Sequence, residues 1–166
     1  SVAVGTDALN AQNFTSATTS YNTAVGHLAG TAVTTGVENT LVGGLAGQFI
    51  STATDSTFIG YRAGLGITGT KLTGNDNTAI GKDAGLLLQG AAASNTFIGA
   101  YAGDAITTSA SNTAVGFEAL STQAAYSENT ALGYRALKVT NGGYYNTAVG
   151  HETLLSNTDG LSNTAV

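Results

Sequence analysis

The sequence predicts an all-β fold in which one short segment is repeated and stacked as a β-solenoid. A five-residue phrase, most often Asn-Thr-Ala-Val-Gly, occurs ten times along the 166 residues, and the tenth copy is truncated after its fourth residue, Val166. Its last residue, here called the anchor glycine, recurs every 17 to 21 residues, at positions 5, 26, 43, 60, 81, 99, 116, 133 and 150. This period is too short for a helix-turn-helix repeat of roughly 34 residues, and the phrase lacks a 3.6-residue apolar rhythm. Each repeat is therefore predicted to be one coil of about nine in a stacked array.

Each coil is predicted to have two walls. The phrase itself is β-prone, and its glycine can turn a corner with φ values closed to other residues. A second segment of the form x-x-Ala-(Gly/Leu) follows, with Ala at its third place in eight of nine copies. A side chain limited to one methyl group is expected where two walls nearly touch.

The whole chain, residues 1–166, is predicted to be a single repeat array and a fragment of a longer fibre. The two longest intervals contain extra Gly, Ser, Thr and Asn near residues 11–20 and 66–76. Insertions of this composition belong in surface loops.

The Asn that begins the phrase is predicted to form a ladder between coils. Like residues stack when coils repeat at the strand spacing, and stacked side-chain amides can bond to one another. A structural role for this ladder is favoured over a binding role. Its members are Asn22, Asn39, Asn77, Asn95, Asn112, Asn129, Asn146 and Asn163, with Ser at positions 1 and 56.

The third place of the phrase is predicted to face outward and to form a seam between chains. In a strand, alternate residues share a face, so the third place lies opposite the second and fourth. The fourth, aliphatic place is expected to fill the coil. An exposed apolar column usually marks an interface, which identical chains can form around a common axis. The predicted seam comprises Ala24, Leu41, Phe58, Ala79, Phe97, Ala114, Ala131 and Ala148.

The phrase followed by x-x-Ala-Leu resembles the head repeats of YadA-like trimeric autotransporter adhesins, and it is similar to repeats of phage tail fibres and long bacterial surface proteins. The resemblance covers essentially the whole chain. It implies a left-handed parallel β-roll, a homotrimer whose strands face the trimer interior, and an extracellular place on a cell surface or virion. The expected function is that of a non-enzymatic shaft or head segment that displays and attaches, with a surface glycan or host receptor as partner.

Composition excludes several other functions. A net charge of −5 with five Lys and Arg residues argues against nucleic-acid binding, which needs clustered positive charge. No run approaches the roughly 20 apolar residues of a membrane span. The chain has no Cys and no Gly-Gly-x-Gly-x-Asp calcium turn, and its Gly-rich segments lack the Lys and strand-helix context of a phosphate loop. His27 and His151 lie seven intervals apart, roughly 34 Å, so one chain cannot join them at a metal. Neither a metal nor a cofactor is expected.

The acidic residues raise the alternative of a carbohydrate-cleaving tailspike, because glycoside hydrolysis generally uses two positioned carboxyl groups. Acidic and basic residues share the second place after the anchor glycine, however, so neighbouring coils bring opposite charges together. A charge ladder is the simpler interpretation, and no catalytic residue is assigned. The ladder comprises Arg62, Asp83, Glu118, Arg135 and Glu152.

Two further alternatives concern the surface. The Thr column at the second place, Thr23 to Thr164, suggests an ice-binding solenoid, although its partner column holds Val, Ile or Leu. Exposed aromatic side chains can stack on sugars or pack over the coils, and the sequence leaves both readings open. These aromatic residues are Tyr61, Tyr101, Phe117, Tyr126, Tyr134, Tyr144 and Tyr145.

Overall fold

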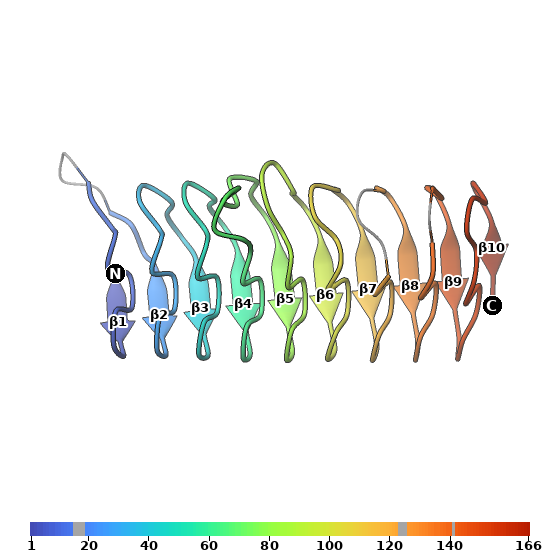
Figure 1. The fold of residues 1–166 in the computed structure, drawn as a ribbon, viewed down its shortest axis with the longest axis horizontal. Helices are drawn as coiled ribbons and strands as arrows, with labels where there is room; N and C mark the ends of the chain where they lie inside the picture. Colours follow the sequence, from blue (N-terminus) through green and yellow to red (C-terminus); the bar gives the residue numbers. More distant parts are fainter. Residues whose placement is uncertain (15–18, 123–125, 141) are drawn as a thin grey trace.

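The computed structural model describes residues 1–14, 19–122, 126–140 and 142–166. It confirms the predicted all-β solenoid: the chain winds through about nine turns, and the described residues contain no helix. Ten short strands form one parallel sheet in chain order, as Figure 1 shows. The strands are β1 (Val2–Val4), β2 (Thr23–Val25), β3 (Thr40–Val42), β4 (Thr57–Ile59), β5 (Thr78–Ile80), β6 (Thr96–Ile98), β7 (Thr113–Val115), β8 (Thr130–Leu132), β9 (Thr147–Val149) and β10 (Thr164–Ala165).

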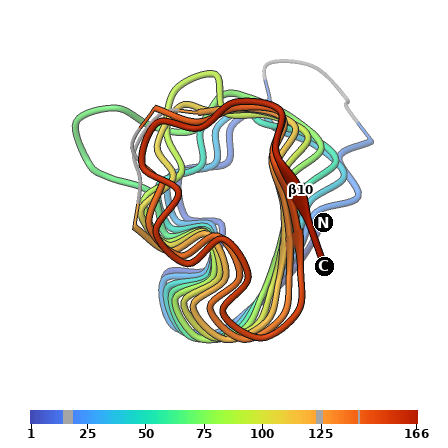
Figure 2. The same ribbon diagram turned by 90° about the vertical axis from the view of Figure 1, so that its right-hand side faces the viewer.

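The register of the sheet aligns each place of the phrase with the same place in the next coil. Thr23 pairs with Thr40, and the alignment holds between all neighbouring strands. Viewed along the long axis in Figure 2, the coils superpose, with the strands forming one straight wall. Every column along the solenoid therefore presents one kind of side chain.

The third place of the phrase points into the coil, which corrects the predicted outward seam. All eight seam residues are fully buried within a single chain, so they cannot meet another chain: Ala24, Leu41, Phe58, Ala79, Phe97, Ala114, Ala131 and Ala148. The expectation that the fourth place fills the coil is also wrong, because Val25, Ile59 and Ile98 are more than a third exposed. The cause is the buried Asn at the first place, since strand alternation puts the third place on the same side.

Large and small residues are matched across the narrow interior. Where the third place is Phe97, the second segment of the same coil ends in Gly103, on which an added Cβ would lie 2.6 Å from the Phe97 ring. Where the third place is Ala114, the second segment ends in buried Leu120 instead. Phe58 with Gly64 follows the first pattern. In these coils one large side chain fills the level of the third place, and two would overlap.

The anchor glycines are required by the stacking of the coils. Gly99 has φ of 128°, which side-chain-bearing residues rarely adopt. A Cβ on Gly99 would also lie 2.5 Å from the carbonyl oxygen of Gly116 in the next coil. Both the turn and the close approach of successive coils therefore need glycine at this place.

The two predicted loop insertions differ in how far the structure describes them. The insertion at 66–76 leaves the wall as the loop seen at the left of Figure 2 and returns at Leu72, which bridges Ile50 and Gly90. The insertion at 11–20 includes residues 15–18, which lie outside the described residues. Leu72 is buried, so the insertion at 66–76 rejoins the core within the same coil.

The Asn column forms a continuous ladder inside the coil. Asn39 donates its backbone N–H to Oδ1 of Asn22 at 2.9 Å and its side-chain amide to the carbonyl oxygen of Ala53 at 2.9 Å. The same pattern recurs along the chain, with Ser56 occupying one level. Each amide thereby satisfies buried backbone groups from its own coil and a neighbouring one. The ladder residues are Asn22, Asn39, Asn77, Asn95, Asn112, Asn129, Asn146 and Asn163.

We predict that Asn112→Ala lowers the free energy of unfolding by about 2 to 3 kcal/mol, because it leaves buried partners unsatisfied. Asn112 is fully buried and donates to the carbonyl oxygen of Tyr126, and its Oδ1 accepts from the amide of Asn129. Asn163→Ala is the matched control: Asn163 is exposed in the last coil, so its loss should be below about 1 kcal/mol. Chemical denaturation followed by circular dichroism measures the free energy of unfolding of both variants. Equal losses of stability in the two variants would contradict the claim that the buried Asn side chains stabilise the solenoid more than the exposed one.

Candidate functional site

The outward side of the strands forms one uncharged surface, here called the outer sheet face. It consists of the second place of each phrase, which is Thr except for Val2 in the first phrase, and of the aliphatic residue at the fourth place. Among the fourth-place residues, Leu132 is 46% exposed and Val25 38% exposed, while the Thr side chains of the internal strands are half-buried. The aliphatic column comprises Val25, Val42, Ile59, Ile80, Ile98, Val115, Leu132 and Val149, and the Thr column comprises Thr23, Thr40, Thr57, Thr78, Thr96, Thr113, Thr130 and Thr147.

The outer sheet face is regular in two directions. Successive strands lie about 4.8 Å apart, and the Thr and aliphatic columns are separated by two residues, about 6.6 Å. Within the described residues, the Thr hydroxyls of this face form no side-chain hydrogen bonds with other protein groups. The result is a flat lattice of methyl and hydroxyl groups along the whole sheet.

One part of the charge ladder is built around the buried carboxylate of Asp83. Arg62 donates from Nε to Oδ1 at 2.7 Å and from a terminal nitrogen to Oδ2 at 2.9 Å, and Lys82 Nζ lies 2.9 Å from Oδ2. Burial alone would raise the pKa of Asp83, but the hydrogen bonds from Arg62 and Lys82 outweigh it and lower the pKa. Lys82 also contacts the hydroxyl of Tyr101.

The other part of the charge ladder joins Glu118, Arg135 and Glu152. Arg135 Nε lies 2.8 Å from Glu118 Oε2, and Lys138 Nζ lies 2.6 Å from the same oxygen. Arg135 also lies 3.8 Å from Glu152. Hydrogen bonds from Lys138 and Arg135 lower the pKa of Glu118. The Arg135 guanidinium therefore lies between the carboxylates of Glu118 and Glu152. A glycosidase would need two such carboxyl groups to be free, one as the acid and one as the nucleophile.

Most of the aromatic residues after the anchor glycines stack on one another. Phe117 and Tyr134 have centroids 5.7 Å apart at 11°, and Tyr134 and His151 have centroids 4.9 Å apart at 15°. Tyr101 meets Phe117 edge to face. Because the rings cover each other's faces, this column is a packing ladder and offers mainly ring edges to a ligand.

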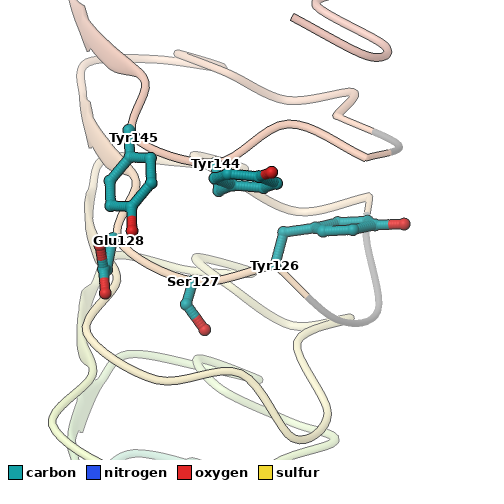
Figure 3. A pocket seen from close by; sticks show the side chains of 5 residues that line it. All are labelled: Tyr126, Ser127, Glu128, Tyr144 and Tyr145. Carbon is teal, nitrogen blue, oxygen red and sulfur yellow. The ribbon is translucent and has the colours of Figure 1, made fainter. Parts of the chain in front are cut away.

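Three other tyrosines line a pocket, here called the tyrosine pocket. Its walls are Tyr126, Ser127, Glu128, Tyr144 and Tyr145, and its volume is about 260 Å³ (Figure 3). These residues precede β8 and β9, so the pocket spans two successive coils. The sequence identified these tyrosines as surface aromatics but not as neighbours, because their proximity depends on the register in which the two coils stack.

The structure places the two histidines far apart. His151 stacks on Tyr134 near the C-terminal end, whereas His27 directly follows β2. Among residues 1–14, 19–122, 126–140 and 142–166, no three His, Cys, Asp or Glu residues are grouped to hold a metal ion. In the same ranges, no helix has the length and apolarity to cross a bilayer.

Asp104 is a perturbed carboxyl group that sequence reasoning missed. Its Oδ1 is buried and has no hydrogen-bond partner within the described structure. Burial raises the pKa of Asp104 to about 6, and the negative charges of Asp83 and Glu118 act in the same direction. No local motif marks this residue, because its burial depends on how the neighbouring coils stack.

No protein-family model, curated protein or solved structure matches this chain.

We predict that Asp104→Asn stabilises the protein near pH 7.5 but not near pH 3.5. The folded pKa of about 6 lies above the ordinary 3.8, so stability is lost as pH rises through this window. Asn cannot ionise and escapes that loss. Because the group is half exposed, the expected gain is about 1 kcal/mol, measured by denaturation at the two pH values. A stability change of equal size at both pH values would contradict a raised pKa of Asp104 in the folded protein.

Proposed function

We propose that this solenoid is a structural segment, shaft or head, of an extracellular trimeric fibre such as a phage tail fibre or bacterial surface adhesin. The coils are proposed to be left-handed, and the chains to form a homotrimer. The observation that carries the proposal is the outer sheet face, an uncharged and partly aliphatic surface that follows all the strands. A continuous apolar surface of this kind commonly marks an interface.

The geometry of the outer sheet face suits association of identical chains. Its length is about 43 Å for nine strand intervals, and its width is about two side-chain columns. Three such faces turned toward a common axis would cover the aliphatic column of each chain and place like residues at the same level. The small Thr and Val side chains would allow close approach.

The resulting fibre would act through rigidity and display. The interior holds an Asn ladder and matched apolar side chains, which resist bending of one coil against the next. Loops such as residues 66–76 project from the wall that lies away from the strands, where they are free to contact a host surface. Attachment would then depend on loops, and the strands would hold them at a fixed spacing.

Ice binding is a second candidate for the same surface. The specific observation in its favour is that two outward columns, Thr and aliphatic, form a flat and regular lattice. Such a face can order water when it is left uncovered. Ice binding and chain association therefore compete for the outer sheet face, and a monomer with thermal hysteresis would favour the ice-binding candidate.

We predict that the protein sediments as three chains and that Ile59→Lys with Ile98→Lys gives monomers, with association weakened at least tenfold by like-charge repulsion at the axis. Both side chains are exposed in the single chain, so the variant should retain its fold. Tyr61→Lys is the matched control, because Lys82 already occupies that place in the next coil. Analytical ultracentrifugation distinguishes the states.

A monomeric wild-type protein at micromolar concentration would contradict the fibre assignment. So would a trimer that survives the double lysine substitution, because its interface would then lie elsewhere. Circular dichroism of each variant checks that the strands remain intact.

A further inference from the structure

We propose that the tyrosine pocket binds an organic ammonium cation, such as a trimethylammonium group. This inference is independent of the fibre proposal, because the pocket lies outside the outer sheet face. The carrying observation is the convergence of three tyrosine rings and one carboxylate from two successive coils on a cavity of about 260 Å³. This volume is just below the usual 300 to 1,000 Å³ of small-molecule sites, which suits a compact ligand.

Tyr126 marks the pocket as a departure from the repeat. The residue three places before the ladder Asn is small in the other described coils that follow the first loop: Gly36, Ala53, Gly74, Ala92, Ser109, Gly143 and Gly160. The carbonyl of Tyr126 still accepts from Asn112 at 2.9 Å, so its backbone keeps the common position. Its ring extends outward beside Tyr144 (Figure 3). A large aromatic residue that breaks an otherwise regular column is the kind of local inconsistency that functional sites show.

The rings offer faces as well as edges to a ligand. Tyr144 and Tyr145 have centroids 5.2 Å apart and an interplanar angle of 76°, so they form a corner. Tyr126 bounds the pocket on another side (Figure 3). A cation placed over such faces is attracted by the ring quadrupoles, most strongly when it is partly desolvated. This arrangement differs from the Phe117 and Tyr134 stack, whose faces cover each other.

The charge of the pocket selects a positive ligand. Glu128 lines the cavity, and no Lys or Arg is among the lining residues. Unlike Asp83 and Glu118, Glu128 has no Lys or Arg partner in the described part of the chain. Interaction with the Glu128 carboxylate raises the pKa of Tyr145, so the phenol and the carboxylate lie close together, and the carboxylate has further acceptor positions for a ligand. A carboxylate among aromatic rings without a paired cation is complementary to an ammonium group.

The site can be tested with choline and its neutral isostere, in which a tert-butyl group replaces trimethylammonium. The two probes have nearly the same shape, so charge alone separates them. Binding is followed by NMR shifts of the tyrosine ring protons and by calorimetry. We expect choline to bind at least tenfold more tightly than the isostere. Equal binding of both probes, or no binding of choline at millimolar concentration, would overturn the proposal.

Matched variants locate the site. Tyr144→Ala and Glu128→Gln should each weaken choline binding by about fivefold or more. Tyr21→Ala and Glu38→Gln are the controls: these residues occupy the column of Tyr145 and Glu128 in distant coils and should leave binding unchanged. Tyr144→Phe retains the aromatic ring and should bind choline as tightly as the wild type. Weak binding by Tyr144→Ala is then attributed to the missing ring and not to a loss of fold. Equal weakening by the control variants would refute the assignment.

Two further arms identify the source of the cation and test a competing ligand. Phosphatidylcholine vesicles, compared with phosphatidylglycerol vesicles, report whether a lipid headgroup is bound as well as free choline. Neutral monosaccharides form the last arm. Sugar binding that is lost in Tyr144→Ala, with no binding of choline, would replace the cation by a carbohydrate and contradict the proposal.

Discussion

The narrowness of the coil is the constraint on which the rest of the structure depends. The inward-facing column of Ala residues in the second segment is fully buried from Ala29 to Ala136, so the two walls stand close together. One large side chain fits at the level of the third place, which is why Phe97 faces Gly103 and Ala114 is accompanied by Leu120. The buried Asn ladder uses the remaining interior space to satisfy backbone groups of adjacent coils. Because buried side chains fill this interior, both surfaces proposed here to have a function lie on the outside of the coils.

The outside is divided between regular columns and local departures from them. The outer sheet face and the stacked Phe117, Tyr134 and His151 rings repeat from coil to coil and suit long contacts or mechanical stiffness. The tyrosine pocket belongs to one pair of coils and suits a discrete ligand. An array of this kind can therefore combine a supporting role along its whole length with a binding role at one level. The charge clusters around Asp83 and Glu118 tie neighbouring coils together and have their carboxylates occupied by Arg and Lys.

Much of the fold could be predicted from the sequence, because a fixed period and strand alternation determine which residues stack. The Asn column and the pairing of Arg62 with Asp83 follow directly from that period. Residue polarity could not show which face of the strand points inward, because both faces carry apolar residues. The inward third place is mostly Ala, and the outward fourth place is Val, Ile or Leu. The size matching between the third place and the end of the second segment was the available signal. Asp104 and the tyrosine pocket depend on stacking between coils, which a single phrase does not encode.

The matched interior is tested most directly by a double-mutant cycle on Phe97 and Gly103. Phe97→Ala should destabilise by about 3 to 5 kcal/mol through a cavity, and Gly103→Leu should destabilise through overlap with the Phe97 ring. Leu at this place is compatible with the backbone, since Leu120 and Leu137 have φ of 52° and 50° there. The double variant reproduces the Ala and Leu pair of the following coils, so it should be more stable than either single variant. Additive losses in the double variant would contradict an interior that has room for only one large side chain at the level of Phe97 and Gly103.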